Sequence, residues 1–498
     1  MRHGGCTRYR SGRLLNRVVS GDPDFVSFMP MSRVLLINAN TCQAPYPVPP
    51  VGLCCIAESL SGRHEVRVFD GTFAGTTGTV EAIRGFDPEY IGIGIRNVDD
   101  LVSEPNTFFI DDALDRFVRP AVAWGRAPVI LGGGAFSIFP GELLALSGAD
   151  FGVIGEGESA CGLLIDTIEK GGDPHAVPGV AVRTAGRVDL PPRPAAPSPM
   201  RYSAIERHID IAPYRQRGAY PIQTKRGCEH RCIYCTYPFV EGNAYRCRTA
   251  ADITAEIAAA AERTGPFTFE FVDSIFNDPP GFAEAICTDI AARGVAVRLR
   301  TMGLNPHGVN GALLDLMRKA GFVQIDCTPD SASPAMIDSL RKNFTRGQLE
   351  RSAAAIRDSG MPTMWFFVFG GPGETAGTVM ETFDFIDRFI APDDLVYVGA
   401  GFRIFPHTGL YDRALADGVI RADRSLLRPA FYFSPAIGRD ELRELLSRET
   451  AGRPNCVPSG ETTPSAAMMT EALRMRTAQK LDEPMFRTLL RLRRLGMR

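Results

Sequence analysis

Apolar runs and helical patterns alternate along the first third of the chain. Five runs have the length and composition of buried strands: 33–38 (RVLLIN), 65–69, 90–95, 128–131 and 151–154. Helical patterns follow or separate them at 52–60, 113–118, 141–147 and 161–169. Strands that alternate with helices predict a mostly parallel sheet covered on both faces. We therefore predict an α/β, doubly wound, Rossmann-like domain over residues 32–171.

The alternation resumes in the second half and runs through six strand and helix units. The strands are predicted at 220–224, 267–272, 295–300, 323–327, 363–369 and 395–402. The helices are predicted at 252–262, 281–293, 311–320, 348–359, 379–389 and 409–416. Repeated units of this kind form a parallel barrel, and six of them suit an open, partial (β/α)6 TIM-like barrel over residues 202–420.

Three further segments flank these domains. Residues 1–31 are rich in arginine and lack the apolar stretch of a secretory signal, so we expect a disordered tail or an upstream start. Residues 172–201 contain a proline-dense stretch, which predicts a linker. Residues 421–498 form an extension whose basic, amphipathic end is expected to dock on a domain edge. Peripheral contact with an anionic membrane is the alternative.

Composition narrows the class of protein. Of 498 residues, 45% are hydrophobic and 22% charged, which excludes disordered and fibrous classes. The net charge of -2 shows no general basic excess for nucleic acid. No apolar run is long enough to span a membrane. Twelve cysteines without a secretory signal indicate a reducing cytoplasm. In that compartment, closely spaced cysteines indicate metal ligands rather than disulfides.

Polar and glycine-rich turns follow the strands of the first domain. A ligand of such a sheet lies beyond the carboxyl ends of its strands. The fingerprint G-x-G-x-x-G is missing after the first strand, which disfavours NAD and FAD. Ordinary loop geometry is the alternative for the GGG turn, and carboxylates also suit a helix N-terminus. The candidate cofactor-binding residues here are Asn40, Arg96, Asn97, Gly132, Gly133, Gly134, Phe136, Ser137, Glu156 and Gly157.

Three cysteines stand together directly after the strand at 220–224. Cys228, Cys232 and Cys235 have the spacing C-x3-C-x2-C, with Tyr234 before the last cysteine. Three thiolates in one loop suit three irons of a [4Fe-4S] cluster and leave the fourth iron open. Structural zinc usually takes four ligands, and His230 and the later cysteines offer no regular zinc-finger spacing.

Two resemblances follow from these motifs. The C-x3-C-x-aromatic-C loop resembles the signature of the radical S-adenosylmethionine superfamily. The pattern of a strand, GGG-x-F-S, a helix and G-E-G-E over 33–158 resembles the cobalamin-binding domain of the class B enzymes of that superfamily. The resemblance implies that the three cysteines bind the cluster, that its open iron chelates S-adenosylmethionine, and that the first domain binds cobalamin. It also implies an electron donor such as flavodoxin or ferredoxin.

One departure concerns the lower face of cobalt. Mutase-type cobalamin domains carry D-x-H-x-x-G after the first strand, and the histidine becomes a cobalt ligand. That loop holds no histidine here. Asp70, Thr72 and Gly75 have the outline of the motif but follow the second strand. We therefore expect cobalt without a histidine ligand, and His64 as an exposed loop residue.

The strand ends of the barrel are polar, and collectively they resemble the family's S-adenosylmethionine pocket. The resemblance implies that Asp273 meets the amino group of S-adenosylmethionine and that Asp326 or Ser331 reaches the ribose. Each residue taken singly could equally cap the next helix. The candidate residues in the barrel are Tyr234, Asp273, Arg298, Asp326, Ser331, Gly370 and Gly371.

The resemblance implies methylation of an unactivated carbon in a small-molecule or lipid-like substrate. A 5'-deoxyadenosyl radical would abstract hydrogen, and methylcobalamin would deliver the methyl group. The RN turn and the PYPVPP and GGGAFSIFP segments resemble a branch with lipid or isoprenoid-like substrates. A radical cyclase or rearrangement enzyme is the first alternative, and a non-catalytic cobalamin or iron-sulfur carrier is the second. Methylthiotransferases fit less well, because Cys42, Cys54 and Cys55 are too bunched for a second cluster.

Overall fold

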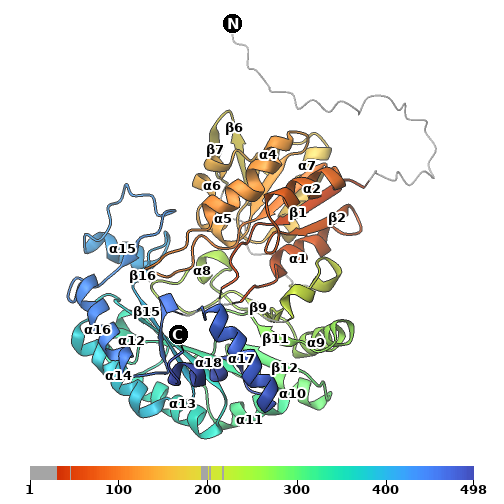
Figure 1. Ribbon diagram of the computed structural model, residues 1–498. Helices are drawn as coiled ribbons and strands as arrows, with labels where there is room; N and C mark the ends of the chain where they lie inside the picture. The colour runs from red at the N-terminus through yellow and green to blue at the C-terminus, as the bar shows by residue number, and fades with distance from the viewer. Residues whose placement is uncertain are drawn as a thin grey trace, which may run out of the picture. The chain divides into compact units, whose positions relative to one another are not determined.

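The computed structural model describes residues 31–497, apart from 45, 192–199, 201–203, 216–217 and 462. Ser32–Arg498 form one compact unit, in which both predicted sheets are present (Figure 1). The predicted tail over 1–31 lies outside the described residues except for Met31. The predicted fold class is confirmed: a Rossmann-like parallel sheet precedes a parallel barrel.

The first sheet has the order β2-β1-β3-β4-β5-β6-β7. Its first five strands are parallel, and the last two are antiparallel additions at one edge. The reversal of strand order on either side of β1 creates a switch point between β1 and β3. The strands are β1 (Arg33–Asn38), β2 (Glu65–Asp70), β3 (Tyr90–Gly94), β4 (Val129–Gly132), β5 (Phe151–Val153), β6 (Val180–Thr184) and β7 (Arg187–Asp189).

Helices cover both faces of this sheet, as the apolar strands require. Alternate residues of β1 pack on opposite sides, with Leu35 in a cluster that includes Phe117 and Leu36 in a cluster that includes Leu60. The helices are α1 (Val51–Leu60), α2 (Thr76–Phe86), α3 (Ile110–Ala113), α4 (Arg119–Trp124), α5 (Gly134–Ile138), α6 (Pro140–Ser147) and α7 (Gly157–Glu169).

The hairpin of β6 and β7 falls within the range 172–201 that we predicted as a linker. β6 pairs with β5, so this part of the range extends the first sheet. Most of the proline-dense stretch lies outside the described residues. The short apolar runs at 180–184 and 187–189, separated by a turn, are typical of a β-hairpin. We assigned them to a linker because of the prolines that follow them.

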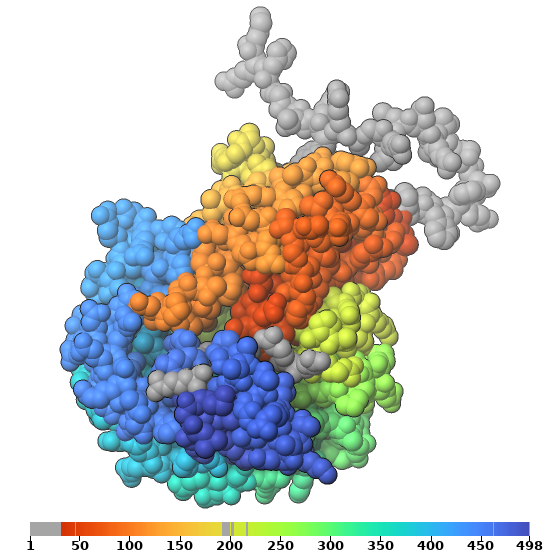
Figure 2. Space-filling model, in the orientation of Figure 1, coloured from red at the N-terminus to blue at the C-terminus, as the bar shows by residue number. Residues whose placement is uncertain are grey.

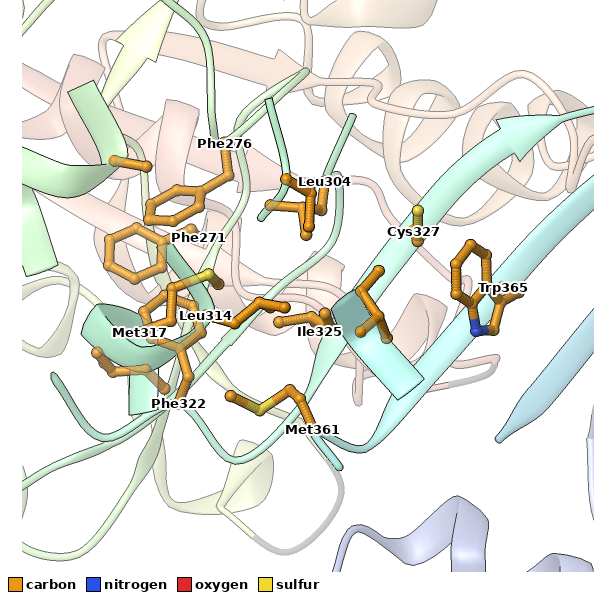
Figure 3. Close-up of a cluster of buried hydrophobic side chains, with 14 of the residues drawn as sticks. Phe271, Phe276, Leu304, Leu314, Met317, Phe322, Ile325, Cys327, Met361 and Trp365 are labelled. Atoms are coloured by element: carbon orange, nitrogen blue, oxygen red, sulfur yellow. The ribbon is translucent and has the colours of Figure 1, made fainter. Parts of the chain in front are cut away.

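Seven parallel strands form the barrel, one more than the six predicted. They are β8 (Tyr220–Ile222), β11 (Thr268–Phe271), β12 (Arg298–Thr301), β13 (Ile325–Asp330), β14 (Thr363–Phe369), β15 (Leu395–Ala400) and β18 (Cys456–Pro458). Between β12 and β13 the pairing is reduced to isolated bridges, Leu299 with Phe322 and Leu304 with Cys327. Figure 3 shows the rings of Phe271, Phe276 and Phe322 packed at this junction, with centroids 4.5–5.6 Å apart.

Outer helices follow the barrel strands in the predicted order. Several begin at polar caps, such as Thr249 before α9 and the capping box of Thr345 and Gln348 at α13. The helices of the barrel are α9 (Ala250–Thr264), α10 (Phe282–Ala292), α11 (Gly311–Ala320), α12 (Pro334–Ser339), α13 (Arg346–Ser359), α14 (Ala376–Phe389) and α15 (Gly409–Ala416).

The C-terminal extension joins the barrel. It contributes β18, α16 (Arg439–Ala451), α17 (Ala466–Gln479) and α18 (Met485–Arg494). Phe486 and Leu490 of α18 pack with Val457, Met364 and Leu395 of the barrel strands. Four arginines of α18 form ion pairs with acidic side chains of the same extension or of the 393–394 turn. These contacts favour docking for this helix, and Figure 2 shows the extension at the surface. Among the described helices, none is long and apolar enough to cross a membrane.

His64 is buried, contrary to the exposed position we expected. Only 6% of its surface is accessible, and neither ring nitrogen has a hydrogen-bond partner among the residues that the structure describes. It lies directly before β2, at the amino end of the strand, so it is remote from the edge where a ligand of the sheet would bind. The helix α1 and the strand β2 enclose the turn that carries it.

We predict that His64→Leu raises the free energy of unfolding by about 1 kcal/mol. A buried polar group without partners costs free energy on folding, and leucine removes that cost at similar volume. Urea denaturation of the cofactor-free protein measures the change. His175→Leu, at an exposed position, is the control and should leave the midpoint unchanged. A loss of stability in His64→Leu would mean that the imidazole has a partner in solution.

Candidate functional site

The cysteine loop leaves the barrel after β8 and is fixed at its first residue. β9 (Lys225–Arg226) pairs with β10 (Arg246–Cys247) beside the loop. Gly227 has φ +87°, and a Cβ there would lie 2.1 Å from the carbonyl oxygen of Ala244. Only glycine fits this position. The amide of Cys228 then donates to the carbonyl of Gly242.

The middle of the loop is held between two later elements of the barrel. The amide of Ile233 donates to the carbonyl of Leu340 at 3.2 Å, and its carbonyl accepts from the amide of Leu410 at 2.7 Å. Cys232 and Cys235 line a pocket of about 410 Å³. Backbone bonds therefore orient these two thiols before any metal binds.

The donor set fits a cluster better than a single metal ion. None of the three thiols forms a disulfide. Burial raises the pKa of Cys228 and of Cys232 above the ordinary value of a thiol. For Cys235, burial raises the pKa to about 12. In the described part of the chain, no three histidine, cysteine or acidic side chains converge on one ion position. Structural zinc usually takes four ligands, whereas three cysteines of one loop can each bind a different iron of a [4Fe-4S] cluster.

A buried polar group lies next to the loop. The phenol of Tyr234 donates to Asp330, which also accepts from the ammonium of Lys342 at 2.6 Å. Lys342 lies 3.3 Å from the Tyr234 oxygen. Sequence reasoning identified Tyr234 but missed Lys342, because a lone lysine after a short helix carries no pattern.

Asp273 accepts hydrogen bonds from the residues that directly precede the cysteine loop. Its Oδ1 accepts from the amides of Thr224 and Lys225, and its Oδ2 accepts from the Thr224 hydroxyl at 2.6 Å. The Lys225 ammonium lies 3.6 Å away. Both carboxylate oxygens are thus engaged by the strand that enters the loop. The predicted contact with the amino group of S-adenosylmethionine gains no support from this arrangement and stays a prediction.

Other predicted residues of the barrel have structural partners. Arg298 is half-exposed and pairs with Asp482 at 2.8 Å, and Ser331 bonds the hydroxyl of Thr382. The amide of Gly370 donates to the buried Glu374. A Cβ at Gly371 would lie 2.8 Å from the Met336 side chain. These contacts explain the residues through packing, and their cofactor contacts stay predictions.

The two faces of β14 differ in burial. Trp365 and Phe367 of β14 face outward, because their rings contact Phe385 of α14. The intervening residues Met364 and Phe366 therefore face inward, and they are only partly buried while the outward residues are buried. Met364 packs with Phe486 and Leu490 of α18, so the C-terminal extension covers part of this inner face.

Charged side chains from three adjacent barrel strands lie together. Glu270 of β11 pairs with Arg300 of β12 at 2.6 Å, and both accompany Asp326 of β13. Burial raises the pKa of Asp326 to about 7, while the hydrogen bond from Gln324 lowers it. Tyr46, from the proline-rich loop after β1, donates to Glu270 at 2.8 Å, and its ring lies 4.2 Å from the Arg300 guanidinium. The first domain thus contributes to the barrel interior.

At the carboxyl edge of the first sheet, several predicted residues hold loops together. Ser137 donates to the carbonyl of Gly133 and accepts from the amide of Gly155, both at 2.9 Å. A Cβ at Gly133 would lie 2.5 Å from the carbonyl oxygen of Ile95. Phe136 is fully buried. The GGG turn therefore permits the close approach of two loops, which is the ordinary geometry we considered.

Open polar groups remain at the switch point beside β1 and β3. Arg96 is exposed and Asn97 partly so, and no side-chain hydrogen bond is found for either among the described residues. Asn40 is buried and bonds the backbone of Cys42. α5 lies against α8 (Tyr237–Val240), which directly follows the cysteine loop. The carboxyl edge of the first sheet therefore faces the segment that directly follows the cysteine loop. The predicted contacts of Asn40, Arg96 and Asn97 with cobalamin stay predictions.

Glu156 joins the first sheet to the segment around the cysteine loop through ion pairs with arginines. Its carboxylate pairs with Arg226 at 2.9 Å and also with Arg246, while Glu158 pairs with Arg226 at 2.6 Å. These arginines belong to β9 and β10, beside the cysteine loop. Gly157 packs against Ile56, where a Cβ would lie 2.6 Å from the side chain. Ion pairs and packing account for Glu156 and Gly157 in this structure, and their predicted contacts with the cofactor stay predictions.

Two family models match the chain in the order of its sheets. The B12 binding domain matches residues 37–165, and the radical SAM superfamily matches residues 222–386. The chain belongs to the cobalamin-binding class of radical S-adenosylmethionine enzymes. The predicted cofactors of this class, a [4Fe-4S] cluster, S-adenosylmethionine and cobalamin, are confirmed with the family.

Several relatives of this radical S-adenosylmethionine enzyme are methyltransferases, and others are magnesium-protoporphyrin IX monomethyl ester cyclases. It is 26% identical over 449 residues to tryptophan 2-C-methyltransferase of Streptomyces laurentii, covering 76% of this chain and 73% of that protein. It is 25% identical to cytidylyl-2-hydroxyethylphosphonate methyltransferase of Streptomyces wedmorensis, over 84% of this chain and 90% of that protein. The structure of the methyltransferase TsrM from Kitasatospora setae, with cobalamin and a [4Fe-4S] cluster bound, matches with a TM-score of 0.78 at 22% identity. That match covers 94% of this chain and 99% of that one.

We predict that Glu156→Ala lowers the free energy of unfolding of the cofactor-free enzyme by about 3 kcal/mol. The substitution removes the mostly buried carboxylate that pairs with both Arg226 and Arg246, and breaking a buried pair has costs of this size. Chemical denaturation measures the loss. Asp423→Ala, which breaks an exposed pair with Arg421, should cost less than about 1 kcal/mol. Equal costs for the two variants would contradict the buried role of Glu156.

We also predict a pH-dependent effect of Asp326→Asn. The folded carboxyl, with a pKa of about 7, keeps a proton that the unfolded carboxyl, with a pKa of 3.8, has lost. Wild-type stability therefore falls as the pH rises from about 4 to 7, by on the order of 2–4 kcal/mol. The asparagine variant lacks this loss. Its free energy of unfolding should therefore increase relative to that of the wild-type protein between pH 5 and pH 8. Parallel stability curves would show an ordinary pKa for Asp326.

Proposed function

We propose that this enzyme methylates a carbon atom of a small molecule bound inside the barrel. The observation that carries the proposal is the charged group on adjacent barrel strands, Glu270, Arg300 and Asp326. Tyr46 of the cobalamin-binding domain donates a hydrogen bond to Glu270 of this group. A substrate bound beside it would lie where the two cofactor-binding domains meet.

In this proposal, different residues of the chain bind the cluster, cobalamin and the substrate. Cys228, Cys232 and Cys235 hold the cluster, and the exposed groups at the switch point, including Arg96 and Asn97, contact cobalamin. Side chains of the barrel interior bind and orient the substrate and restrict the access of water. When bound, the cluster with S-adenosylmethionine supplies a hydrogen-abstracting radical, and cobalamin supplies the methyl group.

The polar part of the substrate is expected next to Arg300 and Asp326. The guanidinium of Arg300 pairs with Glu270 through its Nε. Within the described part of the chain, the carboxyl of Asp326 accepts one hydrogen bond, from Gln324. A neighbouring donor and acceptor favour a substrate with a polar head, while Phe366 and Tyr397, with rings 5.4 Å apart, favour an apolar body. The methyltransferase relatives act on tryptophan and on a cytidylyl phosphonate, so they support methyl transfer without fixing one substrate.

The remaining parts of the proposal are the electron source and the compartment. We expect a low-potential carrier such as flavodoxin or ferredoxin to reduce the cluster in a reducing cytoplasm. The free thiols among the described residues are compatible with that compartment.

The test is anaerobic reconstitution with iron, sulfide and hydroxocobalamin, followed by reductant and S-adenosylmethionine. We expect 5'-deoxyadenosine and S-adenosylhomocysteine, both measured by mass spectrometry. Cys232→Ala should abolish both products, because one iron loses its thiolate. Cys247→Ala is the matched control: this exposed cysteine lies close by in the sequence but outside the loop, and it should retain both.

The outcomes separate the candidate functions. Deoxyadenosine without S-adenosylhomocysteine, with cobalamin bound, would exclude the methylase and favour the radical cyclase or rearrangement enzyme. Neither product from a fully loaded enzyme, even with candidate substrates, would favour a cofactor carrier.

A further inference from the structure

The cysteine loop borders a hollow at the surface of the protein. Cys232 and Cys235 line this pocket of about 410 Å³, and both are partly accessible to solvent. Cys228, the first cysteine of the loop, is buried instead. The hollow therefore brings two of the three cluster ligands close to the protein surface.

The rim of the hollow is positively charged. Arg231 and Arg341 line it and are exposed, and neither guanidinium has an ion pair or a hydrogen bond within the part of the chain that the structure describes. His230 also lines the hollow, and its Nε2 lies 2.7 Å from the carboxylate of Asp278, which offsets any charge on the ring. The carboxylate among the lining residues belongs to Glu229. Two guanidiniums therefore outweigh one carboxylate.

The backbone fixes the rim relative to the cysteine loop. Arg341 has φ +54° and His407 has φ +64°, and such left-handed conformations are uncommon for residues other than glycine. Leu340, directly before Arg341, accepts from the amide of Ile233 between the second and third cysteines. The ring of His407 stacks on that of Phe239, with centroids 4.3 Å apart. The segments that carry the rim are thus held by contacts with the loop and with the helix that follows it.

The lining of the hollow suits a protein partner better than a small cofactor. Pockets for small ligands are mostly apolar, with a few polar groups that fix orientation. Here most of the lining side chains are charged or polar, and the two arginines are exposed. Exposed charges steer an oppositely charged protein toward its docking site and raise its rate of association. The chain as a whole has a net charge of -2, so this attraction is confined to local groups.

We propose that the hollow is the docking surface for an acidic, low-potential electron-carrier protein, which Arg231 and Arg341 attract. The carrier loses one electron and the cluster gains one. Because electron transfer slows steeply with distance, the docking site must lie close to the cluster ligands, and the partly accessible Cys232 and Cys235 meet this requirement. The role rests on the cluster-binding part of the proposed function and requires neither cobalamin nor substrate.

The test compares two reductants of the reconstituted protein in anaerobic stopped-flow experiments, with the visible absorbance of the cluster as the signal. One reductant is a reduced flavodoxin, an acidic protein, and the other is photoreduced 5-deazariboflavin, which is small and uncharged. Flavodoxin should reduce the double variant Arg231→Glu, Arg341→Glu about tenfold more slowly than the wild-type protein at low salt. Added salt should narrow this difference. The deazaflavin should reduce both proteins at the same rate.

A matched control reverses two charges elsewhere on the barrel. Lys319 of α11 and Arg351 of α13 are exposed, and Lys319→Glu with Arg351→Glu gives the same net charge as the test variant. Its flavodoxin rate should stay close to that of the wild-type protein.

Three outcomes would overturn the proposal. They are an unchanged flavodoxin rate in the test variant, equal slowing in both double variants, and slowing of the test variant with both reductants. The last result would place the two arginines in the cluster site itself rather than on a docking surface. A wild-type protein that takes up no cluster would instead contradict the proposed function.

Discussion

The buried ion pairs of Glu156 with Arg226 and Arg246 constrain the whole arrangement. They tie the turn after β5 of the first sheet to the strands that flank the cysteine loop. A second buried pair, Arg403 with Asp99 at 2.7 Å, joins the turn after β3 to the far side of the barrel. Charges in such positions are costly unless paired. These pairs therefore help to hold the carboxyl edge of the first sheet against the barrel.

Much of the fold could be predicted from the sequence because its signals are local. Buried parallel strands are continuous apolar runs, and β1 and β14 begin and end where the pattern indicates. The seventh barrel strand was missed because Cys456–Pro458 is short and lies in a polar region. The hairpin of β6 and β7 was missed for a similar reason. His64 was misplaced because burial of a turn residue depends on tertiary packing.

The candidate site could be predicted only in part. The spacing C-x3-C-x2-C is visible in the sequence, so the sequence alone is enough to predict the cluster ligands Cys228, Cys232 and Cys235. Glu156 and Asp273 were recognised as important positions, but the sequence does not reveal their partners, which lie about 90 and 50 residues away in the chain. Lys342 has no motif at all. Long-range charge pairing is a property of the folded chain, and it decides which polar residues remain available to a ligand.

The late contribution of β18 and α18 has a consequence for biosynthesis. β18 adds to β15, and α18 packs on inward residues of β14 and β15. The apolar wall formed by these strands therefore stays uncovered on the ribosome until residues 456–494 have been synthesised. Until then the nascent barrel exposes a surface that chaperones recognise. Cluster insertion into the cysteine loop would then take place on an incomplete barrel or wait for release of the chain.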